Sequence, residues 1–220
     1  MKRIISLLLA LTLCLSCVFA LASCDVKDII AKIKGEDTSS DANNGNNAEN
    51  EEPKHPILEY YEKMENMENN YKLTMTLSDV PYFGIATMVV YVDGNLEYWP
   101  ETMFNVEEYT ETVGNKKYSY TKNDYGKWIK TSVTDESSED SELLAEKLFD
   151  YNNYEAVEGK ENVYRQKAGV DLGEYSNVVF TLAENSFTIE MTVEEDGMVM
   201  GMTIIVSNFG ESNVTLPKVG

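Results

Sequence analysis

The chain has 220 residues, with 18 basic and 38 acidic side chains and one histidine, so its formal net charge is −20 at pH 7. Such an acidic surface repels nucleic-acid phosphates and anionic lipid headgroups, which argues against nucleic acid as a partner. With three cysteines in the whole chain, a disulfide-rich scaffold is also excluded.

The first residues have the pattern of an export signal. A basic pair, Lys2 and Arg3, precedes an apolar run that ends in Leu21-Ala22-Ser23-Cys24. This ending resembles the bacterial lipobox, which implies cleavage after residue 23, diacylglycerol on the sulfur of Cys24 and an acylated amino terminus. The apolar run is too short to favour a retained membrane span, and plain secretion is the alternative. We therefore expect a lipid anchor on the extracytoplasmic side of the cell membrane.

Removal of the signal peptide, residues 1–23, leaves 197 residues (220 minus 23), enough for one domain. The mature charge is −22, because 16 basic residues face 38 acidic ones, and the only remaining cysteine carries the lipid. Residues 24–55 are predicted to be the lipidated N-terminus and an acidic linker, since Glu36 to Glu52 lacks any large apolar side chain. A single β-rich, ligand-binding domain is predicted over residues 56–220.

Within this domain, apolar spacing predicts a helix from Pro56 to about residue 69 and a second near Glu139–Asp150. Elsewhere the pattern alternates with period two, and three apolar stripes stand out. They are Tyr71, Leu73, Met75 and Leu77; Phe187, Ile189, Met191 and Val193; and Met198, Met200, Met202, Ile204 and Val206. Turn signals at 93–94, 114–115, 124–126, 158–159 and 196–197 predict hairpins. The expected fold is α+β: a strongly curved antiparallel sheet, or half-barrel, of about ten strands covered by two helices.

A lipobox, a polar linker, an amphipathic first helix, a long antiparallel meander and a mid-chain helix together resemble the LolA/LolB/LppX-type lipoproteins. The resemblance covers the architecture of residues 56–217. It implies a half-barrel enclosing an apolar cavity that holds acyl chains. No diagnostic motif supports it, so only the lipidated cysteine is carried over.

Catalytic chemistry is poorly supported. The only histidine, His55, lies at the end of the linker and is expected to be exposed to solvent. No phosphate-binding glycine loop is present, and zinc sites built from His and Cys lack ligands. An acidic pair of the glycosidase type stays open, because carboxylates are plentiful. We expect a non-enzymatic protein without cofactor or metal.

Methionines suggest one ligand site. Met191, Met200 and Met202 share a predicted face, and flexible thioethers suit a cavity for ligands of variable shape. With Leu144 and Phe149 they form the predicted ligand cavity between sheet and helices. Plain core packing and Cu(I) binding are the alternatives.

Aromatic residues suggest a second candidate site. Tyr98, Trp99 and Phe104 are followed by four aromatic residues of a predicted hairpin, Tyr118, Tyr120, Tyr125 and Trp128. If exposed, they could bind a sugar or a protein, but the favoured interpretation is cross-strand aromatic pairing that stabilises the hairpins. The favoured function is a monomeric lipoprotein that binds or carries an apolar ligand, such as a lipid or acyl chain. The alternative is a cell-surface interaction module that binds a protein or glycan through an acidic, Tyr/Trp-rich face.

Overall fold

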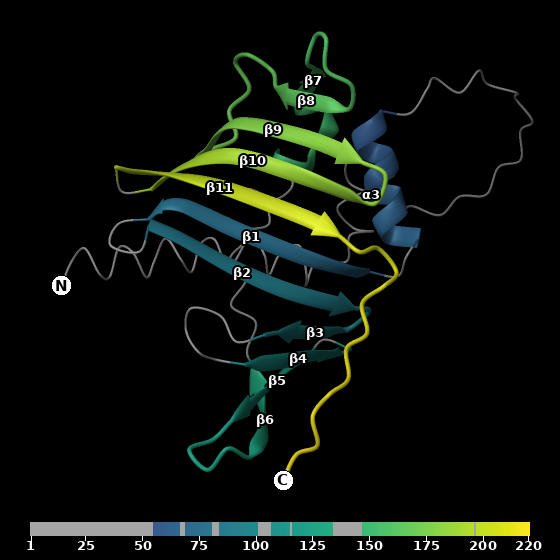
Figure 1. Ribbon diagram of the computed structural model, residues 1–220, viewed down its shortest axis with the longest axis vertical. Coiled ribbons are helices and arrows are strands. Elements are labelled where there is room, and N and C mark those ends of the chain that lie inside the picture. The colour runs from purple at the N-terminus through teal and green to yellow at the C-terminus, as the bar shows by residue number, and fades with distance from the viewer. Residues whose placement is uncertain are drawn as a thin grey trace, which may run out of the picture.

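The computed structural model describes residues 55–66, 69–80, 84–100, 107–114, 116–133, 147–195 and 197–220. The strands are β1 (Asn70–Val80), β2 (Gly84–Asp93), β3 (Leu96–Trp99), β4 (Glu108–Val113), β5 (Lys116–Lys122), β6 (Trp128–Val133), β7 (Tyr154–Ala156), β8 (Val163–Gln166), β9 (Tyr175–Ala183), β10 (Ser186–Glu195) and β11 (Met198–Ser207). All eleven belong to one antiparallel sheet (Figure 1).

The sheet consists of two meanders that meet at its centre. Its strand order is β6-β5-β4-β3-β2-β1-β11-β10-β9-β8-β7, so only the β1–β11 pair joins strands distant in sequence. Each of the five predicted turn segments falls between two paired, consecutive strands, as in β2–β3 and β10–β11. The single antiparallel sheet is therefore confirmed, with six strands before residue 134 and five after residue 153.

The first predicted helix is confirmed as α3 (Pro56–Asn66), which begins on the proline. Its buried residues Ile57, Leu58 and Tyr61 join the core of the sheet. The ring of Tyr60 contacts Phe187 edge-on at 6.3 Å, and Lys63 Nζ donates to the carbonyl of Glu184. Helix α3 therefore packs at the end of the sheet where β9 turns into β10 (Figure 1).

Most of the second predicted helix lies outside the described residues. Residues 147–149 are helical, and Leu148 and Phe149 are buried in the core. A short 3-10 helix, η1 (Tyr151–Asn153), follows, where the Asp150 carboxylate accepts from the amide of Asn152. Among the described residues, α3 is the only helix of seven residues or more.

One face of the sheet forms the core, as the alternation predicts. On β1 and β10 every residue of the predicted stripes is at most 5% exposed. On β11 the stripe is buried from Met200 to Val206, whereas Met198, beside the hairpin turn, is only half-buried.

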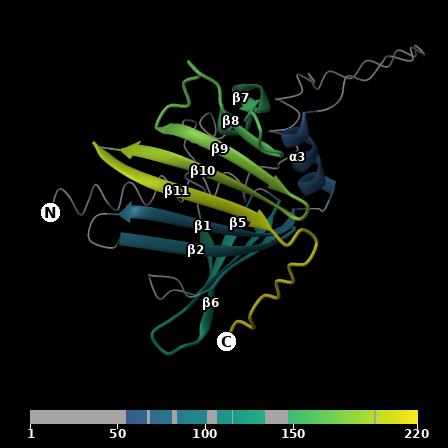
Figure 2. The same cartoon turned by 45° about the horizontal axis from the view of Figure 1, so that its top comes forward.

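The prediction of a strongly curved sheet is wrong. The sheet is not strongly curled. It twists, so that β5 and β6 run at a steep angle to β1 and β2 (Figures 1 and 2). Alternation specifies which side chains are buried, but closure into a barrel depends on strand tilt and stagger, which alternation does not encode.

Candidate functional site: the tyrosine face

The face opposite the core carries a row of tyrosines across four consecutive strands. Tyr91 of β2 pairs with Tyr98 of β3, which pairs with Tyr109 of β4, which pairs with Tyr120 of β5. Side chains alternate along a strand, and the neighbours of Tyr91, Val90 and Val92, are buried in the core. The four tyrosines, called here the tyrosine ladder, therefore project away from the core.

Three rings of the ladder, those of Tyr91, Tyr98 and Tyr109, lie close together and nearly parallel. The centroids of Tyr91 and Tyr98 are 6.0 Å apart and those of Tyr98 and Tyr109 are 4.5 Å apart, with an angle of 24° between planes in both pairs. Trp128 of β6 meets Tyr109 edge-on at 5.3 Å. Tyr91, Tyr98 and Tyr109 are half-buried, whereas Tyr120 is buried. Such cross-strand pairs stabilise the sheet and also present a continuous aromatic surface.

A lysine lies at each end of the ladder. Lys72 pairs with Tyr91, and its Nζ is 5.8 Å from the centroid of that ring. Lys130 pairs with Tyr120, with its Nζ 5.0 Å from the ring centroid. Both contacts are within the range of cation–π attraction, which holds each ammonium group over an aromatic ring.

Two glutamates anchor the phenol groups. Tyr98 Oη donates to Glu107 Oε1 at 3.3 Å, and Tyr120 Oη donates to Glu111 Oε2 at 2.7 Å. Lys122 and Lys130 form ion pairs with these carboxylates at 2.6 and 2.7 Å. Hydrogen bonds from Lys130 and then Tyr120 lower the pKa of Glu111. Burial, followed by the charge of Glu107, raises the pKa of Tyr98 to about 12, so its phenol stays protonated at neutral pH.

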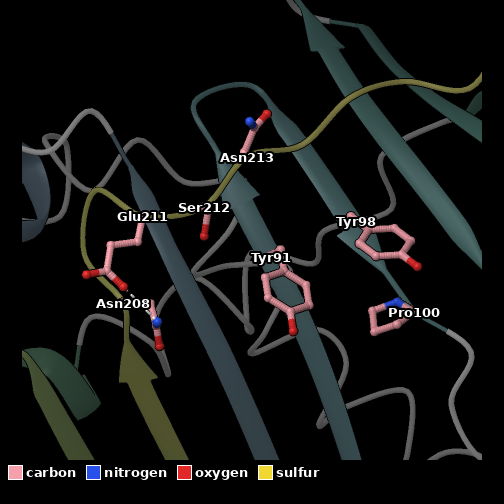
Figure 3. Close-up of a pocket in the computed structure, with 7 residues that line it drawn as sticks. All are labelled: Tyr91, Tyr98, Pro100, Asn208, Glu211, Ser212 and Asn213. Atoms are coloured by element: carbon pink, nitrogen blue, oxygen red, sulfur yellow. Dashed lines mark hydrogen bonds between the residues drawn. The ribbon is translucent and has the colours of Figure 1, made fainter.

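The C-terminal tail forms a wall beside the ladder. An open cleft of about 450 Å³ is lined by Tyr91, Tyr98 and Pro100 on the sheet side and by Asn208, Glu211, Ser212 and Asn213 on the tail side. In Figure 3 the two rings and Pro100 lie across from the tail residues, and Asn208 donates to Glu211. Six of the seven lining side chains carry a hydrogen-bonding group.

Side chains of the sheet hold the tail in position. Asn70 of β1 donates to Asp93 and to the carbonyl of Ser212, and accepts from the amide of Ser212. Asp93 in turn accepts from the amide of Val214 at 3.1 Å. Because Val214 is itself buried, polar and apolar contacts together set the position of the cleft wall.

The residues predicted for an apolar cavity lie on the other face. Met191, Met200 and Met202 are 5%, 2% and 2% exposed and belong to the core, as does Phe149. Met202 pairs with Met191 on one side and with Leu77 on the other. Leu144 lies outside the described residues. The shared face is confirmed, and whether it admits a ligand stays a prediction.

The prediction of a solvent-exposed His55 is wrong. Its ring is 5.2 Å from the rings of both Tyr151 and Tyr164, and it is half-buried. Its Nδ1 accepts from the amide of Ile57, and its carbonyl accepts from the amide of Glu59. The histidine therefore caps α3 and belongs to the domain, because capping requires a side-chain acceptor beside the first turn.

A cluster of buried polar side chains lies on the core face of the sheet, around Glu97 of β3. Glu97, 4% exposed, accepts from Trp99 Nε1 at 3.2 Å, from Thr110 Oγ1 at 2.6 Å and from Lys117 Nζ at 3.3 Å. Its carboxylate oxygens are thus used by neighbouring side chains, which fits a structural role.

In the described part of the chain, no three or more His, Cys, Asp or Glu side chains are placed to share a metal ion. No helix among these residues is long and apolar enough to cross a membrane.

No known family model matches the sequence, and a search of curated proteins finds no match to it either. The resemblance to LolA/LolB/LppX-type lipoproteins therefore stays a prediction, and the strong curvature that it implies is not found.

Sequence reasoning found only part of the tyrosine face. It singled out Tyr98, Tyr118, Tyr120 and Trp128 but missed Tyr91 and Tyr109. The available signal was a tyrosine in the outward position of each successive strand. The register of the paired strands places these tyrosines opposite one another in a row. This register was not predicted from the sequence.

Proposed function

We propose that the chain is a non-catalytic binding protein, anchored to the extracytoplasmic side of the cell membrane through lipid on Cys24, which holds its ligand on the tyrosine face. The domain acts as a monomer on an acidic linker. The proposal combines the lipobox with the ladder and the cleft beside it.

The row of tyrosines on consecutive strands is the observation that carries this proposal. Three half-buried aromatic rings in register on the face opposite the core carry the proposal because, although they also stabilise the sheet, a solvated face tolerates ordinary polar residues in their place. Tyrosine offers a rigid, amphipathic contact surface at low entropic cost, which is why binding surfaces are enriched in it. The adjoining cleft has the size of a small-ligand site.

Co-sedimentation tests this proposal. The purified protein, kept in detergent, is mixed with cell walls isolated from the cells that produce it, and the bound fraction is measured. Tyr98→Ala is expected to reduce binding by at least about fivefold, because it removes the ring at the centre of the face. Tyr125→Ala is the matched control, since Tyr125 is 88% exposed on a turn outside the ladder. Equal binding by Tyr98→Ala and the parent, or no binding by the parent, would contradict the proposal.

A second candidate is a carrier of an apolar ligand, such as a lipid or acyl chain, between sheet and helices. The observation in its favour is the gathering of Met75, Met88, Met191, Met200 and Met202 on the core face of four adjacent central strands. Thioether side chains adapt to ligands of different shape. This function is also what the resemblance to LolA/LolB/LppX-type lipoproteins implies.

One variant separates the carrier from a filled core. If Met200 lines a cavity, Met200→Trp abolishes uptake of a fluorescent fatty acid with little loss of stability. If Met200 is close-packed, the larger side chain costs about 1–3 kcal/mol of unfolding free energy. A thermal melt and a probe titration give both answers, and a parent protein that binds no probe excludes the carrier.

A further inference from the structure

We infer that the ligand of the tyrosine face is an uncharged glycan, bound across the strands along the ladder with one end in the cleft of Tyr91, Tyr98 and the tail. This inference rests on the proposed function and names its ligand class. It follows from the charge balance of the face, the chemistry of the cleft and the dimensions of the ladder.

The surroundings of the ladder are electrically balanced in a protein that is strongly acidic as a whole. Four cations lie on the outward side of β1, β5 and β6: Lys72, Lys116, Lys122 and Lys130. Four carboxylates match them: Glu107 and Glu111, which accept from the ladder phenols, and Asp93 and Glu211 at the cleft. A site for a cationic peptide needs unmatched carboxylates, and a site for an anionic polymer needs unmatched lysines. The local balance therefore selects a ligand without net charge.

The cleft offers hydrogen bonds beside the apolar surface of its two rings and Pro100. Asn208, Asn213 and Ser212 supply amide and hydroxyl groups, Glu211 supplies a carboxylate, and Tyr91 and Tyr98 add phenols. A ligand rich in hydroxyl groups can donate to and accept from such a set. A lipid chain cannot, and it would desolvate these groups without compensation.

Nearly parallel rings complement a sugar chain. A pyranose presents a face of C–H groups, which carry slight positive charge and meet the negative face of an aromatic ring. Three half-buried rings in sequence, Tyr91, Tyr98 and Tyr109, repeat this contact from strand to strand. Hydrogen bonds at the rim combined with stacking on the rings suit a glycan.

Size favours a chain over a single sugar or a folded protein. The three half-buried rings, Tyr91, Tyr98 and Tyr109, cross two strand intervals and therefore span about 10 Å. That length exceeds one sugar ring. A stable protein–protein interface commonly buries about 800 Å² on each partner, which calls for a broad surface rather than a narrow row with a cleft at one end.

The test compares two probes that share their sugar backbone and differ at the nitrogen of each ring. The N-acetylglucosamine hexamer is uncharged, whereas the glucosamine hexamer has free amines that become ammonium groups in mildly acidic solution, where both titrations are done. Each is titrated into the full-length protein in detergent by calorimetry, at low and at high salt. We expect the acetylated hexamer to bind with an affinity that salt hardly changes, because no ion pairs form.

Variants connect binding to the face. Tyr98→Ala is expected to weaken binding of the acetylated hexamer about tenfold, and Tyr125→Ala to leave it unchanged. Glu211→Gln and Asn213→Ala alter the cleft without touching the ladder or the core, so they report on the site even if Tyr98→Ala melts early. Each is expected to weaken binding several-fold.

The possible failures are distinguishable. Tighter, salt-sensitive binding of the glucosamine hexamer would overturn the inference of an uncharged ligand. If neither hexamer binds but co-sedimentation with cell walls still depends on Tyr98, the glycan inference fails and the proposed function stands. If the acetylated hexamer binds equally to Tyr98→Ala, Glu211→Gln and Asn213→Ala, the tyrosine face is not the site and both proposals fail.

Discussion

The ion pair of Glu97 and Lys117 is buried, and burial changes how much an ion pair contributes to stability. Glu97 and Lys117 are both at most 9% exposed, and Glu97 accepts three hydrogen bonds. Glu97→Ala leaves the buried lysine without this carboxylate, so we expect a loss of about 3–5 kcal/mol in unfolding free energy. Urea denaturation measures this loss, provided that the dependence of the unfolding free energy on urea concentration has the same slope in the variant and the parent.

The exposed pair of Glu155 and Arg165 is the control for this prediction. Its two atoms are 2.9 Å apart, yet the side chains are 44% and 60% exposed. Solvent screens such a pair, so Glu155→Ala is expected to cost less than about 1 kcal/mol. Equal losses in the two variants would show that burial does not set the strength of the Glu97 cluster.

His55 gives the domain a pH dependence. Burial, and secondarily the charge of Lys167, lowers the pKa of His55 below its ordinary value of about 6.5. The unfolded chain therefore binds more protons than the folded one near this pH, and stability falls as the pH drops through about 6.5. The variant His55→Asn retains a capping acceptor but cannot take up the proton. We therefore expect its melting temperature to fall less than that of the parent when the pH is lowered from about 7.5 to about 5.5. Parallel melting curves of parent and variant would contradict this assignment.

At the scale of elements, the sequence predicts what depends on neighbouring residues. The stripes of β1, β10 and β11 follow from alternation, and α3 follows from Pro56 and the spacing of Ile57, Leu58 and Tyr61. Properties that depend on distant residues were not predicted. These are the β1–β11 pairing, the register that aligns the ladder and the docking of the tail. His55 was misjudged for the same reason, because Tyr151 and Tyr164, which pack on it, lie far along the chain.

Asn70 is the side chain that makes the most hydrogen bonds in the docking of the tail. Asn70 makes two hydrogen bonds with the backbone of Ser212 and one with Asp93. Asn70→Ala is expected to cost about 2–3 kcal/mol and to speed amide exchange at Ser212 and Val214, since each lost bond is worth about 1 kcal/mol.

Asn185→Ala is the matched control for the tail. Asn185 is exposed and accepts a bond from Lys63 at 3.3 Å, outside the tail. It should leave exchange at Ser212 unchanged. Unchanged exchange in Asn70→Ala as well would mean that the remaining contacts, the buried Val214 and the hydrogen bonds to Asp93 and to the Tyr71 carbonyl, are enough to hold the tail.

At the scale of the molecule, the fold separates three tasks. The core face stabilises the domain, the tyrosine face remains available to a ligand, and the residues before His55 are proposed to connect the domain to the membrane. The central strands β1 and β11 come from opposite ends of the domain sequence. The sheet is therefore complete only when β11 is in place. Because β11 lies between β1 and β10, its loss would leave each of these two strands with an unpaired edge.

At the scale of the whole protein, the proposed membrane anchoring rests on a single atom, the sulfur of Cys24. Two or more acyl chains hold a protein stably on a membrane, whereas a single chain gives marginal, reversible attachment. Cys24→Ala is therefore expected to appear in the soluble fraction or as uncleaved precursor, while the parent sediments with membranes. Cys17→Ala is the matched control, because that cysteine lies within the predicted signal peptide and should leave processing and anchoring intact. Mass spectrometry of the mature N-terminus and fractionation of cells measure both outcomes. A Cys24→Ala protein that is processed and remains fully membrane-bound would show that the anchor lies elsewhere in the chain.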